Sequence, residues 1–299
     1  MVLRKLPMIL SLLLILLLLL TGCGPAAEQQ VDIAATTGPV AQFAGAIVEG
    51  SGLTVAQVVT DSVSCLHDYS LSVRQMEVVE KSRVVLLSGA GLEAFLEDAL
   101  QTVDTVVDAS AGIELLEACH DHDHGHDHDH GHDHEADPHI WLDPARAARM
   151  AENLCVGLTQ VYPEHAALFH ANTETLKTRL LDLQAYGQQE LAGLSCRKLI
   201  TFHDGFGYLA DAFGLEILAA IEEEAGSEAS ASDLIEMVGL VRSHSLPAIF
   251  TEINGSPSAA SVIHAETGAV VYSLDMAMGG SDYFAAMEAN IHTLKEALQ

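Results

Sequence analysis

The chain alternates short runs of β-branched and aliphatic residues with helical segments, in two separate series. In the first half we expect strands at residues 31–36, 54–60, 83–88 and 105–110. In the second half we expect strands at residues 198–202, 215–220, 247–252 and 269–274. Strands that alternate with helices form βαβ units and a mostly parallel sheet. The pattern therefore predicts an α/β protein with two lobes and not one long sheet.

One long helix is expected between the two series, over residues 162–194. Pro163 suits a first helical turn, and the leucines of this segment recur at spacings of three and four. Two helices that break near Gly187 are the alternative. A single helix of this length would extend about 48 Å. It would join the two lobes and restrict how far they open.

The N-terminus carries the signature of an exported protein. Arg4 and Lys5 precede an apolar run from Met8 to Leu20, and Leu-Thr-Gly-Cys follows and ends at Cys23. This is the layout of a secretory signal at residues 1–22, with an uncleaved membrane anchor as the alternative. The last four residues resemble the lipobox of bacterial lipoproteins. That resemblance implies a mature chain that starts at a lipidated Cys23, a tether at residues 23–30, and an extracytoplasmic protein anchored to the bacterial membrane on the cell surface or the periplasmic face.

The charge balance excludes one class of partner. The chain has 13 Lys and Arg residues against 42 Asp and Glu residues, a formal charge of −29. So few cations cannot build the basic surface that nucleic acids need. A protein this acidic would instead concentrate cations near its surface.

Four cysteines lie beyond the signal: Cys65, Cys119, Cys155 and Cys196. An exported chain can oxidise them, and four cysteines allow three pairings. A bond between Cys155 and Cys196 is weakly preferred, because both flank the same predicted helical region. Free buried thiols are the alternative.

One segment has low complexity, with a histidine at every even position and only Asp or Gly between them. Its members are His120, His122, His124, His126, His128, His130, His132 and His134. Because the segment offers no apolar side chain to pack, we expect a loop. Imidazole and carboxylate groups suit divalent transition metals such as Zn²⁺. A site on a flexible loop loses chain entropy on binding, so the tightest site is expected elsewhere.

Four other residues are better placed to bind a metal. His139 lies between Pro138 and Pro144, and we expect its backbone to be extended. His203 directly follows the strand at 198–202, at the carboxyl edge where α/β sheets bind ligands. His67 follows the second strand after a short loop, and Asp275 follows the eighth. Taken singly, each is more often structural, as we expect for the helical histidines His165, His170, His244, His264 and His292.

Four motifs together resemble one family. They are DPHIWLDP at 137–144, TFHDGFGYLADAFGL at 201–215, SGAGLEAFL at 88–96, and the segment 274–298. They are similar to the metal-specific substrate-binding proteins of ABC importers, in the zinc-binding lipoprotein branch that resembles ZnuA and TroA. The resemblance runs from Val31 to Leu298. It implies a first α/β lobe at 31–161, a linking helix at 162–194, a second lobe at 195–299, and a metal in the cleft between the lobes.

The resemblance also implies a ligand set. Matched motif by motif, the ligands are His67, His139, His203 and Asp275. In the manganese branch the third position is typically a glutamate, whereas here it is His203. Three nitrogens and one carboxylate oxygen favour zinc in near-tetrahedral coordination. The chain departs from the family at residues 64–70, where it has Ser-Cys-Leu-His-Asp-Tyr-Ser, so the loop that carries His67 is expected to have a different shape.

The function that the resemblance implies is capture of Zn²⁺ and its delivery to an ABC permease driven by a cytoplasmic ATPase. We expect a monomer that is not an enzyme, in which the histidine run gathers or buffers zinc. Alternatives are a protein for manganese or another divalent metal, and a surface adhesin lipoprotein. A zinc hydrolase is disfavoured, because four protein ligands would leave no position for an activated water.

Overall fold

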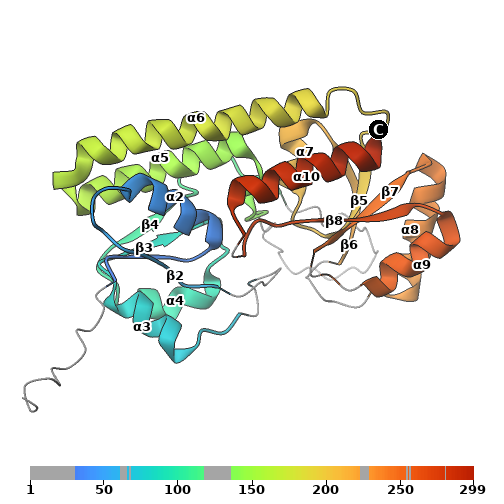
Figure 1. The fold of residues 1–299 in the computed structure, drawn as a ribbon. Coiled ribbons are helices and arrows are strands. Elements are labelled where there is room, and N and C mark those ends of the chain that lie inside the picture. The colour runs from blue at the N-terminus through green and yellow to red at the C-terminus, as the bar shows by residue number, and fades with distance from the viewer. Residues whose placement is uncertain are drawn as a thin grey trace, which may run out of the picture. The chain divides into compact units, whose positions relative to one another are not determined.

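Two sheets, each of four parallel strands, form the framework of the computed structural model of the protein (Figure 1). The structure describes residues 31–60, 66, 69–117, 136–222, 229–253, 255, 257–279 and 281–299. The predicted signal and tether with Cys23, His67 and the histidine run at 120–134 lie outside these residues. The predicted α/β class with two mostly parallel sheets is confirmed.

The first sheet has the strand order β2-β1-β3-β4. The elements up to the linking region are β1 (Ile33–Ala35), α2 (Gly38–Val48), β2 (Val55–Gln57), α3 (Val73–Lys81), β3 (Val84–Leu87), η1 (Ala94–Leu96), α4 (Glu97–Leu100), β4 (Val106–Asp108), η2 (Ile140–Leu142) and α5 (Pro144–Val161). The central strands β1 and β3 are buried runs of Ile, Val, Leu and Ala, as expected for a parallel sheet covered on both faces. All four predicted strands of this series are present.

The second sheet repeats the arrangement with the order β6-β5-β7-β8. Its elements are β5 (Lys198–His203), α7 (Gly207–Phe213), β6 (Glu216–Glu222), α8 (Ala231–His244), β7 (Ala248–Glu252), α9 (Pro257–Thr267), β8 (Val270–Leu274) and α10 (Tyr283–Leu298). The four strands predicted for the second half are also present. Strand β5 ends at His203, one residue later than predicted, so this histidine is the last residue of a central strand.

The linking helix is shorter than predicted. Residues 163–165 form the 3-10 helix η3 (Pro163–His165), and α6 (Ala166–Glu190) is 25 residues long, or about 37 Å. The helix passes through Gly187 without a break. A Cβ on Gly187 would lie 2.3 Å from the Phe213 ring and 2.9 Å from Ile291, so this glycine permits close packing and does not end the helix.

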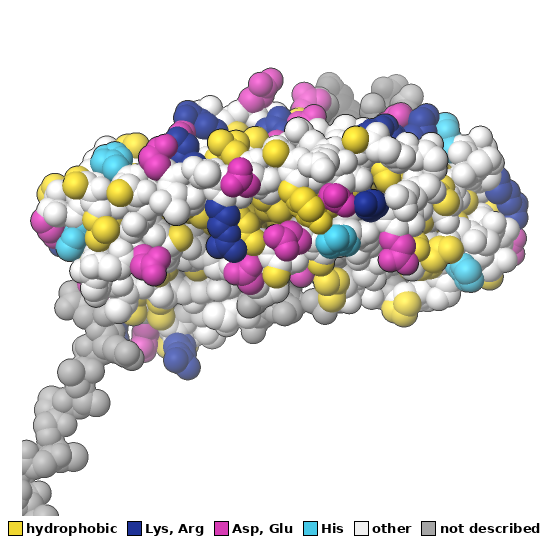
Figure 2. Space-filling view, turned by 45° about the horizontal axis from the view of Figure 1, so that its top comes forward, with side chains coloured by type: hydrophobic (Ala, Val, Ile, Leu, Met, Phe, Trp, Pro, Cys, Tyr) yellow, Lys and Arg dark blue, Asp and Glu magenta, His cyan; other side chains and the backbone are white. Residues whose placement is uncertain are grey.

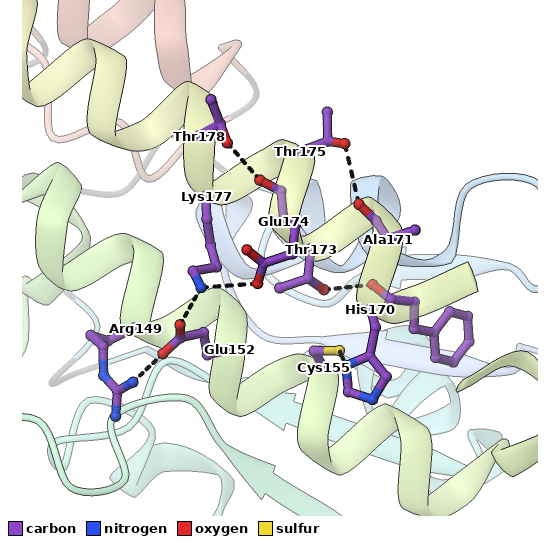
Figure 3. A network of polar contacts seen from close by, with 11 residues as sticks. Arg149, Glu152, Cys155, His170, Ala171, Thr173, Glu174, Thr175, Lys177 and Thr178 are labelled. Carbon is purple, nitrogen blue, oxygen red and sulfur yellow. Dashed lines mark hydrogen bonds and ion pairs between the residues drawn. The ribbon is translucent and has the colours of Figure 1, made fainter. Parts of the chain in front are cut away.

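Helices α5 and α6 pack against each other, and an ion pair between Lys177 and Glu152 crosses their contact (Figure 3). Lys177 Nζ on α6 lies 2.5 Å from Glu152 Oε1 on α5 and 3.0 Å from Glu174 Oε1, and Arg149 pairs with the same Glu152. These side chains lie near the surface, where such pairs each contribute about 0 to 1 kcal/mol. The apolar face of the helix pair supplies most of the stability.

The suggested disulfide between Cys155 and Cys196 is wrong, because both are free thiols. Cys155 is buried on α5, with Sγ 3.6 Å from His170 Nδ1 (Figure 3). Cys196 precedes β5, and its thiol donates to the Lys198 carbonyl at 3.3 Å. Closeness of both residues to one helical region in sequence does not bring their Cα atoms within the roughly 7 Å that a disulfide needs. Cys65 and Cys119 lie outside the described residues.

The largest hydrophobic cluster among the described residues extends through both halves of the chain, and each half also has a smaller cluster of its own. The largest cluster contains Phe43 and Trp141 from the first half together with Phe250, Met287 and Leu294 from the second. Helix α6 contributes to this core and contacts α2, α7 and α10, which follow or precede strands of different sheets. The two sheets therefore do not have separate principal cores, which limits their relative movement beyond what the linking helix alone would impose.

Hydrogen bonds also tie the segment after β8 to the first half of the chain. The Trp141 indole donates to the Met276 carbonyl at 2.8 Å, and the Gly38 amide donates to the Met278 carbonyl at 3.2 Å. The Gln42 side chain donates to the Ser281 carbonyl at 2.9 Å and accepts from the Tyr283 amide at 2.8 Å. Residues 275–283, which include Asp275, are thus held by elements of the first half.

Acidic and basic side chains are interspersed on the face shown in Figure 2. The large negative charge of the sequence is therefore not concentrated in one patch on this face. Among the described helices, none is both long enough and apolar enough to cross a membrane.

Candidate metal site

His139 lies at the start of η2, where the chain turns into α5. Its backbone has φ −83° and ψ 40°, so the predicted extended conformation is wrong. The reason is a 3-10 turn: the Leu142 amide donates to the His139 carbonyl at 3.1 Å before Pro144 opens α5. The side chain is only 5% exposed. This turn fixes the ring in the interior of the protein.

A buried carboxylate two residues earlier holds the His139 ring. Asp137 Oδ1 lies 2.8 Å from His139 Nδ1 and accepts the His139 backbone N–H at 2.9 Å. Asp137 is itself 3% exposed, and a Cβ on Gly207 at the start of α7 would lie 2.8 Å from Asp137 Oδ2. Metal-binding histidines commonly direct one ring nitrogen to a carboxylate and the other to the metal. His139 has this arrangement.

His203 is the last residue of β5 and is 4% exposed. Strand β7 pairs with β5 in parallel, with Thr201 opposite Phe250, so two residues later His203 comes level with Glu252. The two side chains meet, with His203 Nδ1 3.8 Å from Glu252 Oε1, and Glu252 is 5% exposed. A second buried carboxylate therefore faces Nδ1 of the second histidine.

Gly205 keeps space open beside the other nitrogen of His203. A Cβ at this position would lie 2.7 Å from His203 Nε2 and 2.8 Å from the Met276 methyl group. Real Cβ atoms do not approach other atoms so closely, so an alanine here would push against the ring edge. The absence of a side chain at position 205 therefore avoids a close contact with the buried Nε2 edge of His203.

The structure brings His139, which precedes η2, together with His203 at the end of β5. Their ring centroids are 5.3 Å apart and the rings are nearly perpendicular, at 86°. Zinc–nitrogen distances of about 2.0–2.1 Å and a tetrahedral angle place the centroids of two histidine ligands about 5 Å apart. The pair therefore has the spacing that two ligands of one zinc ion require.

Asp275 follows β8, in the segment held by the first half of the chain. Its Oδ1 accepts the Ala277 amide at 2.8 Å, and its backbone N–H donates to Asn290 Oδ1 at 2.8 Å. Its neighbour Met276 reaches the Gly205 position beside His203. Within the described residues, however, no three His, Cys, Asp or Glu side chains gather into a metal-binding group. Asp275 therefore does not form a three-ligand cluster with His139 and His203 in this structure.

The position of His67 lies outside the described residues, but both of its near neighbours are described. Leu66 is fully buried in the shared core, and its carbonyl accepts the Tyr69 amide at 3.1 Å. The structure thus gives the positions of Leu66 and Tyr69, the described residues on either side of His67.

The histidine run at 120–134 is likewise flanked by described residues. Glu117 and Ala136 pair as an isolated antiparallel bridge, and the Asp137 amide donates to the Leu116 carbonyl at 2.9 Å. The Leu116 amide in turn donates to the Tyr208 hydroxyl at 3.0 Å, and burial raises the pKa of Tyr208 to about 12. The described residues that flank the run, Glu117 and Ala136, therefore lie next to Asp137, two residues from His139.

Three of the histidines that we expected to be structural have structural partners. His170 lies beside Cys155, His264 Nδ1 is 2.8 Å from the Ala269 carbonyl, and His292 Nε2 is 3.2 Å from the Tyr186 hydroxyl. These contacts fix helix packing and helix ends.

Sequence analysis missed three residues that shape the pair: Asp137, Glu252 and Gly205. Asp137 stands in the same motif as His139, and Glu252 closes a predicted strand. The rule that strand ends bind ligands would have pointed to Glu252, had it been applied to every strand. Nothing in the sequence distinguishes Gly205 from its neighbour Gly207.

Comparison with known proteins identifies the family of the chain. The family described as ZnuA, zinc-uptake complex component A, periplasmic, matches residues 33–297. The chain belongs to this family. The ZnuA family consists of solute-binding proteins, so the resemblance of this chain to the substrate-binding proteins of ABC importers is confirmed.

Individual relatives are more distant. A protein of Treponema pallidum described as metal-binding is 28% identical over 261 residues, which cover 84% of this chain and 82% of that protein. The zinc-binding lipoprotein AdcA of Streptococcus pneumoniae is 25% identical over 309 residues, 98% of this chain but 61% of AdcA. A crystal structure of ZnuA has a TM-score of 0.78 at 25% identity and covers 91% of this chain and all of that one. The two-lobed ZnuA fold is therefore confirmed.

Proposed function

We propose that this protein captures Zn²⁺ outside the cytoplasmic membrane and delivers it to an ABC importer, which consists of a permease and a cytoplasmic ATPase. The observation that carries the proposal is the buried pair of His139 and His203, with ring centroids 5.3 Å apart. The two histidines come from different halves of a ZnuA-family chain, one before η2 and the other at the end of β5. The names of relatives such as the zinc-binding lipoprotein AdcA support zinc as the cargo.

The ligand set of the proposal is His67, His139, His203 and Asp275. Three imidazole nitrogens and one carboxylate oxygen suit zinc, and four protein ligands leave no position for a reactive water. The proposed role is accordingly binding and delivery, not catalysis. The shared core and the hydrogen bonds to residues 275–283 support a bound state that differs little in lobe position from the metal-free one.

Three further parts of the proposal concern the cell. The mature protein is a monomer anchored through a lipid on Cys23, with its metal site outside the cytoplasm. The histidine run gathers zinc and passes it to the site. The described residues support this transfer in one respect, because Glu117 and Ala136, which flank the run in the sequence, pair beside Asp137.

The test is metal analysis of protein purified without added metal, with residues 120–134 replaced by a short Gly-Ser linker. We expect about one zinc per chain in this parent and none in the variant His139→Ala/His203→Ala. The control variant His170→Ala/His264→Ala changes two histidines elsewhere and should keep its zinc. Equal zinc in the parent and the His139/His203 variant would refute the site.

Delivery is tested in cells in which this chain is the sole zinc-binding protein of the importer. We expect the parent to restore growth at limiting zinc and the His139→Ala/His203→Ala variant to fail. Metal-free protein offered equal amounts of Zn²⁺ and Mn²⁺ should retain zinc. Preferential retention of manganese would assign the protein to the alternative cargo.

A further inference from the structure

Each histidine of the candidate site faces a buried carboxylate that is not in the proposed ligand set. His139 Nδ1 lies 2.8 Å from Asp137 Oδ1, and His203 Nδ1 lies 3.8 Å from Glu252 Oε1. Both carboxylates are at least 95% buried. Buried carboxylates are uncommon unless a partner compensates their charge.

The chemistry of the contact at Asp137 decides which ring nitrogen carries hydrogen. An ionised carboxylate can only accept hydrogen bonds. His139 Nδ1 must therefore be the donor, which in the neutral ring leaves Nε2 with a free electron pair. The hydrogen bond made by one ring nitrogen sets the state of the other. Neutral imidazole in water favours hydrogen on Nε2, the form that cannot bind a metal through that atom.

The two carboxylates are positioned by different parts of the fold. Asp137 is local to His139: it also accepts the His139 backbone N–H, and Gly207 gives its other oxygen room. Glu252 reaches His203 from the neighbouring strand, through the parallel register of β5 and β7. Two independent elements thus place a carboxylate at the same atom of each ring.

We propose that Asp137 and Glu252 are positioning residues for zinc: they hold His139 and His203 in the form with hydrogen on Nδ1, so that both Nε2 atoms are ready to bind the same ion. The proposal rests on the proposed zinc site. Asp137 acts through a full hydrogen bond. Glu252 at 3.8 Å is beyond hydrogen-bond distance and acts on its ring mainly by charge. Gly205 keeps the Nε2 edge of His203 clear for the ion.

The first test measures zinc affinity by chelator competition, in protein without residues 120–134. We expect Asp137→Asn, which removes the charge, to weaken binding about 10- to 100-fold, the usual range for such partners. Glu252→Gln should weaken it less, because its contact is longer. The control is Glu93→Gln, which changes an equally buried carboxylate in the first lobe and should leave the affinity unchanged. Affinities of both site variants within twofold of the parent would overturn the proposal.

The second test separates positioning from folding. Ring ¹⁵N chemical shifts of the metal-free protein at about pH 8.5, where imidazoles are neutral, report the hydrogen on each nitrogen. We expect hydrogen on Nδ1 of His139 in the parent and mainly on Nε2 in Asp137→Ala, with chemical-shift dispersion elsewhere retained. An Asp137→Ala protein that keeps hydrogen on Nδ1 would refute the proposal, whatever its stability.

The two proposals fail in different ways. If His139→Ala/His203→Ala keeps its zinc, the metal site itself is wrong. If that variant loses zinc while Asp137→Asn and Glu252→Gln bind as tightly as the parent, the metal site stands and the positioning role alone is wrong.

Discussion

The carboxyl ends of the two sheets occupy equivalent places in the fold but use their polar side chains differently. In the first sheet, Glu93 accepts the Ser88 and Gly89 amides at 2.7 and 3.1 Å and the Thr36 hydroxyl at 2.6 Å. In the second sheet, the carboxylate at the end of β7 faces a histidine. The carboxylate at the edge of the first sheet accepts hydrogen bonds from nearby backbone amides, whereas the carboxylate at the edge of the second sheet faces an imidazole.

This difference shows that a buried carboxylate at a strand end does not by itself identify a metal site. At Glu93 the partners are backbone amides and a hydroxyl of the same lobe, so the group stabilises a turn. At Glu252 the partner is His203, which meets a histidine from the other half of the chain. The partner of the carboxylate therefore distinguishes the edge at Glu93, called the structural edge, from the edge at Glu252, called the binding edge after the proposed metal site. Four experiments test that distinction.

The largest expected effect is on the structural edge, in Gly89→Ala. Gly89 has φ +87°, and a Cβ there would lie 1.9 Å from Asp108 Oδ1 and 2.3 Å from Ser110 Oγ. We expect the free energy of unfolding to fall by about 4 kcal/mol, from overpacking and backbone strain together. The measurement is urea denaturation of the metal-free protein.

The matched control is Gly91→Ala. Gly91 has φ +85° but no atom within 4 Å of its Cβ position, so only the strain of about 1 kcal/mol should remain. Equal losses of unfolding free energy in Gly89→Ala and Gly91→Ala would show that the close contacts of a Cβ at position 89 with Asp108 and Ser110 do not contribute.

The second effect is the pH dependence of stability at Glu93. Burial raises the pKa of this carboxyl from 4.5 to about 7, although its hydrogen bonds from Thr36, Ser88 and Gly89 lower it. The folded state therefore holds the proton more tightly than the unfolded chain. The resulting stabilisation is complete below about pH 4.5 and is lost as the pH rises through 7, a change of about 3 kcal/mol.

The measurement compares the metal-free parent with Glu93→Gln by urea denaturation between about pH 4.5 and 8. The free energy of unfolding of the parent should fall relative to the variant across this range, while zinc affinity stays the same in both. Parallel pH profiles would mean that Glu93 titrates at its ordinary value.

A smaller effect is expected on the binding edge, in Gly205→Ala. The new methyl group would press on the Nε2 edge of His203 and on the Met276 methyl group. Because the Met276 side chain can move, we expect little loss of stability but about tenfold weaker zinc binding, or 1.4 kcal/mol. Chelator competition measures the affinity. Gly193→Ala, with no atom within 4 Å of its Cβ position, is the control. An unchanged affinity in Gly205→Ala would place the metal away from this edge of the ring.

The smallest effect concerns the tie between the two edges. Trp141→Phe removes the hydrogen bond to the Met276 carbonyl, beside Asp275, and should cause only a small loss of zinc affinity; because Trp141 is fully buried, the cavity left by the smaller ring adds to the hydrogen-bond loss of about 1 kcal/mol in stability. Tyr283→Phe removes the bond from Tyr283 to the Trp141 carbonyl, which does not reach Met276. It should cost about 1 kcal/mol of stability with no change in affinity. The same loss of affinity in both would argue against a specific role of the Met276 contact.

The strands could be predicted from sequence because buried parallel strands are short, continuous apolar runs, and all eight were located. The ends of the linking helix could not, because the leucines at 191 and 194 continue the helical spacing after the backbone has turned. The proposed ligands His139 and His203 were selected from their motifs. Glu252 was missed because its distance from His203 depends on the register of two strands whose paired residues, Thr201 and Phe250, are 49 positions apart in the sequence. The prediction of a disulfide between Cys155 and Cys196 was wrong for the same reason, because positions in the sequence do not give distances in space.

The bridge between Glu117 and Ala136 has a practical consequence. Because Glu117 and Ala136 are paired neighbours, the sequence between them can be exchanged for a peptide of another length with little cost in loop-closure free energy, about 0.6 kcal/mol for each doubling of length. A fluorescent reporter domain inserted there would start and end beside Asp137, next to the proposed ion. The same point offers a route to a genetically encoded zinc sensor.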